Sequence, residues 1–190
     1  SCLQILGSHG IGVPKTIYVS NQYTMPFLLE EMEPYPIIIK LVSGTQGMGV
    51  ILAENKSNAE SILEAFYATR EKVIMQKFIR EAKGADIRAF VVDGEIVGAM
   101  KRQAKPGDFR SNLHRGGTSE LITLTSQEEE TALKSVEILG LKIAGVDMLK
   151  TNSGPVVLEV NASPGLEGIE GTTGVDIAGK IISFIEKNRK

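Results

Sequence analysis

The segment GPVVLEVNASPGLEG, residues 154–168, begins as an apolar strand and then carries polar side chains just before it breaks at Ser-Pro-Gly. Strand alternation places Val157, Glu159 and Asn161 on one face and Val156, Leu158 and Val160 on the other. The preceding strand, AGVDMLK, contains Asp147, and the turn between the strands falls at residues 151–154. A hairpin centred near Ser153 sets Asp147 directly opposite Glu159, unless a bulge shifts the register by one residue.

Two directly opposed carboxylates repel each other, and a cation between them is one way to stabilise the pair. Together with the amide of Asn161, Asp147 and Glu159 offer only oxygen ligands, which suit Mg²⁺ and do not suit zinc. Three protein ligands leave coordination positions open, and Mg²⁺ usually fills these with water and substrate phosphates. These residues therefore predict a magnesium site that faces a phosphate-bearing substrate. The alternative is a pair of solvent-exposed strand carboxylates.

A glycine-rich loop connects the two strands of IIIKLVSGTQGMGVIL. After Ser43, the residues Gly44, Gly47 and Gly49 allow the backbone to approach a ligand closely and to direct N–H groups at it. The Walker pattern is absent, because no Gly-Lys-Ser/Thr followed by a helix occurs here. The segment predicts a hairpin flap that covers a triphosphate, with Lys40 as a cation for the phosphates. The alternative is an ordinary glycine-rich turn beside an exposed lysine.

Two further segments contain candidate binding residues. The strand that ends in QKFI, residues 76–79, offers an apolar slot and a polar edge for a purine, although an ordinary apolar strand fits the same pattern. Basic residues are concentrated in KRQAKPGDFRSNLHRGG, at Lys101, Arg102, Lys105, Arg110 and Arg115. Such a cluster can stabilise a transferring phosphoryl group or bind an acidic substrate. A solvated basic loop and an RNA contact are the alternatives, and the shortage of aromatic residues disfavours single-strand nucleic-acid binding.

Short strands and helices alternate along the chain, and hairpins occur among them, which is typical of an α+β fold. We expect strands at 15–20, 35–42, 49–55, 71–79, 86–102 (a hairpin turning at Asp93-Gly94), 141–150 and 154–161. Capping boxes at Ser57/Glu60 and Ser126/Glu129 predict two helix starts. Residues 1–14 are interpreted as the end of a helix and linker from a preceding N-terminal domain. Residues 15–76 are expected to form one lobe, with the loop 43–49, and residues 77–190 a second lobe with the metal site.

The composition excludes several classes of protein. The chain has 190 residues, of which 42% are hydrophobic, and its 23 acidic residues slightly outnumber its 21 basic ones. This balance provides no basic field for non-specific nucleic-acid binding. No apolar run is long enough to span a bilayer, so no membrane partner is expected. The single cysteine, Cys2, excludes an internal disulfide and fits a reducing cytoplasm.

In their order along the chain, Lys40, SGTQGMG, QKFI, DIR, VDML and LEVNASPGLEG resemble the ATP-grasp superfamily. Within it, DFRSNLHRGG together with EVNASPGLEGIE resembles the RimK-type α-L-glutamate ligases. The resemblance implies two α+β lobes, with mainly antiparallel sheets, that grip ATP between them. It also implies a ligase that phosphorylates an acceptor carboxylate to an acyl phosphate, which the amine of L-glutamate then attacks. The implied acceptor is the C-terminal tail of a ribosomal protein. A small metabolite, an amino-group carrier protein, or a non-catalytic ATP-binding module are alternatives, and a homo-oligomer is left open.

The resemblance also assigns roles to individual residues. Two Mg²⁺ ions, or Mn²⁺ in their place, would be held by Asp147, Glu159 and Asn161, with Glu159 bridging them. The nucleotide would contact Lys40, Ser43, Gly44, Gly47, Gly49, Gln76, Lys77, Phe78, Ile79, Asp86, Arg110 and Asn112, with Asp86 at the ribose hydroxyls. The catalytic residues would be Arg110 and Asn112 at the transferring phosphate and Arg102 and Arg115 near the carboxylates. One departure concerns Gly145, because some ATP-grasp ligases have an arginine two residues before the metal aspartate; Arg110 is a candidate substitute.

Overall fold

The computed structural model describes residues 2–19, 22–42, 49–68 and 71–189. It divides into two compact units: residues 14–79, here the small unit, and residues 1–13 with 80–190, here the large unit. The second boundary lies three residues beyond the expected one at 76/77, because the strand Val73–Lys77 pairs with the small-unit sheet over its whole length. Across the described ranges, no helix combines the length and the apolar character needed to cross a membrane.

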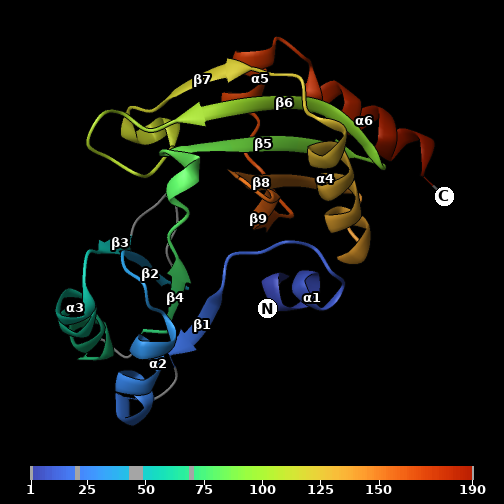
Figure 1. Ribbon diagram of the computed structural model, residues 1–190. Coiled ribbons are helices and arrows are strands. Elements are labelled where there is room, and N and C mark those ends of the chain that lie inside the picture. The colour runs from blue at the N-terminus through green and yellow to red at the C-terminus, as the bar shows by residue number, and fades with distance from the viewer. Residues whose placement is uncertain (1, 20–21, 43–48, 69–70, 190) are drawn as a thin grey trace. The chain divides into compact units, whose positions relative to one another are not determined.

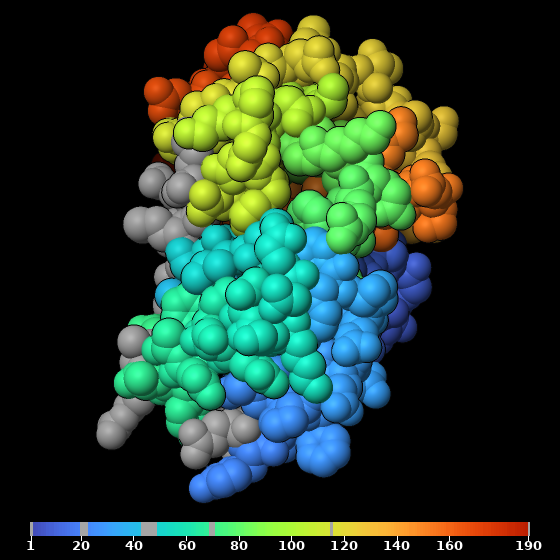
Figure 2. All heavy atoms as spheres, turned by 60° about the vertical axis from the view of Figure 1, so that its left-hand side comes forward, coloured from blue at the N-terminus to red at the C-terminus, as the bar shows by residue number. Residues whose placement is uncertain are grey.

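The small unit contains an antiparallel sheet with one face covered by helices. The strands lie in the order β1 (Thr16–Val19), β4 (Val73–Lys77), β2 (Ile37–Leu41) and β3 (Val50–Ala53). After the 3₁₀ turn η1 (Gln22–Thr24), α2 (Met25–Glu31) and then α3 (Lys56–Ala68) pack on this sheet, and both helices are visible on the surface in Figure 2. Their apolar faces meet Ile37, Ile39 and Met75 in a fully buried core. The polar alternate residues of these strands are therefore left on the face without helices.

The large unit contains a second antiparallel sheet, with helices on both faces (Figure 1). The strands lie in the order β7 (Thr118–Leu121), β6 (Glu95–Gln103), β5 (Ala85–Val92), β8 (Ile143–Thr151) and β9 (Gly154–Asn161). The remaining elements are α1 (Cys2–Ser8), η2 (Arg80–Ala82), η3 (Leu113–Arg115), α4 (Ser126–Ile138), α5 (Glu167–Thr173) and α6 (Ile177–Lys187). The predicted α+β class is confirmed.

Strand alternation gives the large-unit sheet two different faces. On one face, Ala89, Val91, Val146 and Met148 are fully buried, in a core that α1 and α4 cover. On the other face, Phe90 and Met100 are buried beneath α5 and α6. These two helices cover only part of that face, and further along the same strands lie the charged residues Asp86, Arg88, Arg102 and Asp147. We call this charged region the polar face of the large unit.

Local turn chemistry agrees with the sequence at one position and differs at two. Asp93 and Gly94 have φ of +49° and +79° and close the β5–β6 hairpin, as predicted. Both expected capping boxes are misplaced, because neighbouring residues can cap the same helix. At the start of α3, the side chain of Asn55 accepts a hydrogen bond from the Asn58 N–H (2.9 Å). At the start of α4, Thr125 and Glu128 form the capping box. The sequence also did not predict α5, which follows the Ser-Pro-Gly break.

The first residues of the chain pack on the large unit. Leu6 of α1 is fully buried in the same core as Val146, and the Gly12 carbonyl accepts a hydrogen bond from the Val157 N–H (2.8 Å). The backbone of residue 12 therefore partners the outer edge of β9, an edge that would otherwise present unpaired groups. This contact holds β9 in place from the side opposite β8.

Candidate functional site

The β8–β9 hairpin places the predicted acidic residues opposite each other. Asp147 pairs with Glu159, and Gly145 pairs with Asn161. Nearer the turn, Thr151 pairs with Gly154 and Met148 with Val157, so the turn consists of residues 152 and 153 and is not centred on Ser153. The two registers are reconciled by a bulge at Leu158, an additional residue in β9. The opposition of Asp147 and Glu159 is confirmed, and the hairpin does contain a bulge, which the sequence analysis had left open.

The bulge also corrects the predicted faces of β9. Val157 was expected on the same face as Glu159, yet it is fully buried in the core under α4. Its partner, Met148, lies in the same core, whereas Asp147 lies on the polar face. One additional residue between positions 157 and 159 reverses the alternation. Glu159 therefore faces away from the core, although a regular strand would have buried it.

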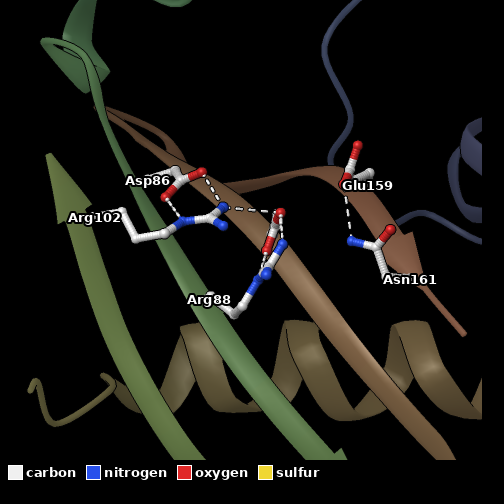
Figure 3. Close-up of polar contacts among 6 residues, drawn as sticks. Asp86, Arg88, Arg102, Glu159 and Asn161 are labelled. Carbon is white, nitrogen blue, oxygen red and sulfur yellow. Dashed lines mark hydrogen bonds and ion pairs between the residues drawn. The ribbon is translucent and has the colours of Figure 1, made fainter. Parts of the chain in front are cut away.

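Asp147 also belongs to an ion-pair network of four charged side chains on the polar face (Figure 3). The other three are Asp86, Arg88 and Arg102. Arg88 donates from Nε and Nη2 to the two carboxylate oxygens of Asp147, at 2.7 and 2.6 Å. Arg102 donates from Nε to Asp86 (2.7 Å) and shares its Nη2 between Asp86 and Asp147 (2.9 Å to Asp147). Bidentate pairs of this kind have a fixed planar geometry, so the network holds Asp147 rigidly.

The network is buried, and its charges balance. Asp86, Arg102 and Asp147 are only 4%, 6% and 3% exposed, and charges at such depth are stable only when they are paired. Burial by itself raises the pKa of the Asp147 carboxyl, but the charge of Arg102 and the hydrogen bonds from Arg88 outweigh it and lower that pKa. For Asp86 burial dominates over Arg102, and the pKa is raised. Burial disfavours the Arg102 cation, yet Asp147 and Asp86 hold its pKa above the ordinary value.

The donor set fits a hard divalent cation. Glu159 is exposed, and its Oε1 accepts a hydrogen bond from the Asn161 amide nitrogen (2.8 Å, Figure 3). The amide oxygen of Asn161 takes no part in this hydrogen bond. Two carboxylates from paired strands and one amide oxygen match the ligands that Mg²⁺ prefers. Over the described part of the chain, no three His, Cys, Asp or Glu side chains gather as a metal site. A cation here therefore depends on the amide and on substrate oxygens as well as on the two carboxylates.

Arg88 is the member of this network that the sequence analysis missed. It lies two residues after Asp86 in the DIR segment, and alternation places both on the polar face. A Cβ built on Gly145 would lie 2.9 Å from Pro164 Cβ and 3.9 Å from the Arg88 Nε. Arg88 therefore adjoins the position where some ATP-grasp ligases have their arginine. The sequence analysis had suggested Arg110 for that role.

The loop between β6 and β7 contains the other predicted catalytic residues. Asp108 Oδ1 accepts hydrogen bonds from the Arg110 Nε and backbone N–H, both at 3.0 Å, and the guanidinium lies over the Phe109 ring at 5.3 Å. Asn112 precedes the 3₁₀ turn η3 as its N-cap residue, and Arg115 is the last residue of that turn. The Arg115 side chain lies outside the described part of the structure.

The Asp108–Arg110 pair predicts a measurable titration. Hydrogen bonds from the Arg110 side chain lower the pKa of Asp108 from 3.8 to about 2. Because the folded pKa lies below the unfolded one, the pair stabilises the loop at neutral pH and loses this contribution as the pH falls from about 4 to about 2. We expect carboxyl-carbon NMR to give a pKa near 2 in the wild type and a clearly higher one in Arg110→Gln, which stays below the ordinary value because the backbone N–H groups of Phe109 and residue 110 still donate to Asp108. The same pKa in both proteins would contradict the pairing.

In the small unit, two predicted nucleotide residues lie on the face without helices. Ile37 and Ile39 point into the helix-covered core, so Ile38 and Lys40 alternate to the other face, and Gln76 is the partner of Ile38 in β4. The side chain of Gln76 is almost fully buried and donates to the Thr16 hydroxyl (2.9 Å). Among the described residues, this face therefore carries Ile38 and Lys40 of β2 beside the buried Gln76 of β4.

The other residues predicted to contact the nucleotide lie at the end of β4 and around the glycine-rich segment. Lys77 directs its ammonium at the carbonyls of Met32 and Pro34 (2.7 and 3.0 Å), and burial lowers its pKa, as does nearby Lys15. Phe78 and Ile79 follow β4, where the small unit ends. Gly49 has φ of +69°, and a Cβ there would clash with the Leu41 side chain at 2.7 Å, so only glycine fits. Ser43, Gly44 and Gly47 lie outside the described residues.

Comparison with known proteins agrees with this geometry. The sequence matches the RimK-like ATP-grasp domain over residues 1–185. A relative from Azotobacter vinelandii, named probable alpha-L-glutamate ligase, is 53% identical over 186 residues, 98% of this chain and 62% of its own length. The chain thus spans less than two thirds of the length of such relatives.

Solved structures give the same result for the fold. The RimK domain ATP-grasp protein from Sphaerobacter thermophilus has a TM-score of 0.73 and 27% identity, over 96% of this chain and 64% of its own. The ATP-grasp ligase PsnB, solved with a variant of its minimal precursor, Mg and ADP, has a TM-score of 0.73 and 22% identity, over 99% of this chain and 57% of its own. The predicted ATP-grasp fold is confirmed, and the chain belongs to the RimK-like ATP-grasp family.

Proposed function

We propose that this protein is an ATP-dependent carboxylate–amine ligase that adds L-glutamate to the C-terminal tail of a ribosomal protein in the cytoplasm. The observation that carries the proposal is the opposition of Asp147 and Glu159 beside Asn161 on the polar face. This is an oxygen-only donor set in a chain similar to proteins named probable alpha-L-glutamate ligase. A ligase that activates a carboxylate with ATP requires such a site for the phosphates.

The reaction proceeds in two steps. An acceptor carboxylate oxygen attacks the γ-phosphorus of ATP, which forms an acyl phosphate and releases ADP. The glutamate amine then attacks the acyl carbon, and the amide forms as inorganic phosphate leaves and the nitrogen loses a proton. Neither step requires a covalent nucleophile on the enzyme, so catalysis consists of positioning and charge stabilisation.

Different residues of the chain would bind the metal ions, the nucleotide and the carboxylate substrates. Asp147, Glu159 and Asn161 would hold two Mg²⁺ ions, or Mn²⁺ in their place, which neutralise the phosphate charge when bound. Lys40 and the segment 43–49 bind and cover the phosphates, and Gln76–Ile79 form the purine slot. Asp86 lies at the ribose, although Arg102 already donates to both of its oxygens. Arg110, Asn112 and Arg115 orient the transferring phosphate and the carboxylate substrates.

The test follows isotopic glutamate. The purified protein is incubated with cell extract, ATP, Mg²⁺ and heavy L-glutamate, and intact-mass spectrometry then identifies every polypeptide or metabolite that gains glutamyl mass. We expect a ribosomal protein to gain one or more heavy glutamyl residues at its C-terminus, and a parallel reaction with a non-hydrolysable ATP analogue to yield none. A labelled metabolite or carrier protein would replace the proposed acceptor with that substrate. ATP binding without ADP release or labelling would overturn the ligase assignment.

A further inference from the structure

The ion-pair network on the polar face involves both oxygens of Asp147, the residue proposed to bind the metal. Asp147 Oδ1 accepts from Arg88, and Oδ2 accepts from both Arg88 and Arg102. Each oxygen that a cation would use is therefore already hydrogen-bonded to a guanidinium. The three hydrogen bonds use three of the roughly four lone-pair sites of the carboxylate. A divalent cation that binds Asp147 would therefore lie close to both guanidinium groups, and like charges close together at such depth repel each other strongly.

Of the two arginines, Arg88 is the one that can leave. Arg102 has a second carboxylate, Asp86, and keeps its bidentate pair with it if Asp147 is withdrawn. Within the part of the chain that the structure describes, Arg88 donates to Asp147 alone. The Arg88 side chain is also 16% exposed, compared with 7% for that of Arg102. Displacement of Arg88 therefore breaks one pair and moves a side chain that already reaches solvent.

Arg88 also borders the other side of the metal site. It pairs with Asp147 across β5 and β8, and its Nε lies next to Gly145, the residue paired with Asn161. Gly145 contributes no side chain here, and Pro164 lies over it beside the Arg88 Nε. A cation that binds the oxygens of Asp147 would therefore come close to the Arg88 guanidinium, which donates to the same two oxygens.

We propose that Arg88 is the counter-ion of Asp147 in the metal-free protein, and that a divalent cation takes over Asp147 by displacing it. Arg88 is then a positioning residue: it pairs with the buried carboxylate through both of its oxygens and fixes its orientation until the cation arrives, and it weakens metal binding in the absence of nucleotide. This inference rests on the metal site of the proposed function. The exchange changes only ion pairs and hydrogen bonds.

The test measures Mn²⁺ affinity of the purified protein by electron paramagnetic resonance, without nucleotide. Loss of a competing bidentate pair in Arg88→Ala is expected to tighten Mn²⁺ binding ~tenfold. Arg88→Lys keeps the charge but loses the bidentate geometry, so it should tighten binding ~threefold. Lys101→Ala is the matched control: it removes a cation from neighbouring β6, where Lys101 pairs with Glu120 at the surface (2.9 Å). Its Mn²⁺ affinity should remain within ~twofold of the wild type.

A second measurement covers the case in which Arg88→Ala folds poorly. In EDTA, the melting temperature of Arg88→Ala should fall relative to the wild type, and saturating Mn²⁺ should remove most of that difference, because the cation replaces the lost counter-ion. If both Arg88 variants bind Mn²⁺ no more tightly than the wild type while Glu159→Gln abolishes binding, the counter-ion role is wrong and the metal site stands. If Glu159→Gln binds Mn²⁺ like the wild type, the metal site itself is wrong.

Discussion

Glu159→Ala is expected to reduce Mg²⁺-dependent ADP release by about a thousandfold and to leave the fold intact. Glu159 would supply one of the two carboxylates that hold the proposed metal ions, and loss of such charge stabilisation costs several kcal/mol in the transition state. The fold should tolerate the change, because Glu159 is exposed and, among the described residues, its side chain forms a single hydrogen bond, with Asn161. Exposed substitutions of this kind alter stability by only about 0.5 kcal/mol.

A coupled assay of ADP release, run across a range of Mg²⁺ concentrations, checks this prediction. Glu120→Ala is the matched control, since Glu120 is an exposed carboxylate on the same sheet that pairs with Lys101. That variant should release ADP at the wild-type rate. Turnover by Glu159→Ala within tenfold of the wild type at saturating Mg²⁺ would contradict the placement of the metal site.

The acidic pair was predictable from the sequence, but the way in which the strand presents it was not. Asp147 and Glu159 were expected opposite each other, and they are. The expectation assumed regular alternation, which would have placed Val157 beside Glu159. The structure instead inserts Leu158 as a bulge, so that Val157 is buried and Glu159 is exposed. Bulges depend on cross-strand pairing and turn geometry, and the one-dimensional pattern of a strand does not encode them.

The ion-pair network illustrates a different limit. Each of its residues belongs to a strand that the sequence predicted, and Arg102 and Asp86 were already candidate site residues. Arg88 was missed because its importance depends on its partner, Asp147, which lies 59 residues further along the chain. Alternation along β5 places Arg88 on the face of Asp86, but only the pairing of β5 with β8 brings it to Asp147. Strand neighbours of this kind follow from topology, which a single sequence constrains weakly.

Removal of Asp147 from the ion-pair network is expected to reduce the stability of the protein. Asp147→Leu should destabilise the protein by about 3 kcal/mol, because it removes the partner of the largely buried Arg88 and one of the two carboxylates that pair with the buried Arg102. Adding Arg88→Met should recover most of this loss, since an apolar pair of similar volume can replace a buried ion pair at little cost. Urea unfolding of the wild type, Asp147→Leu and the double variant measures both steps.

The double variant also separates the stability of the fold from the function of the site. It should unfold near the wild-type midpoint and yet bind no Mn²⁺, because the carboxylate that the cation requires is gone. Lys101→Met with Glu120→Leu is the matched control: these residues form an exposed pair on the same sheet, and its loss should change stability by less than about 1 kcal/mol. A double variant as unstable as Asp147→Leu alone would show that the unpaired charge of Arg88 is not the cause of the loss, and that Asp147 supports the sheet by other contacts.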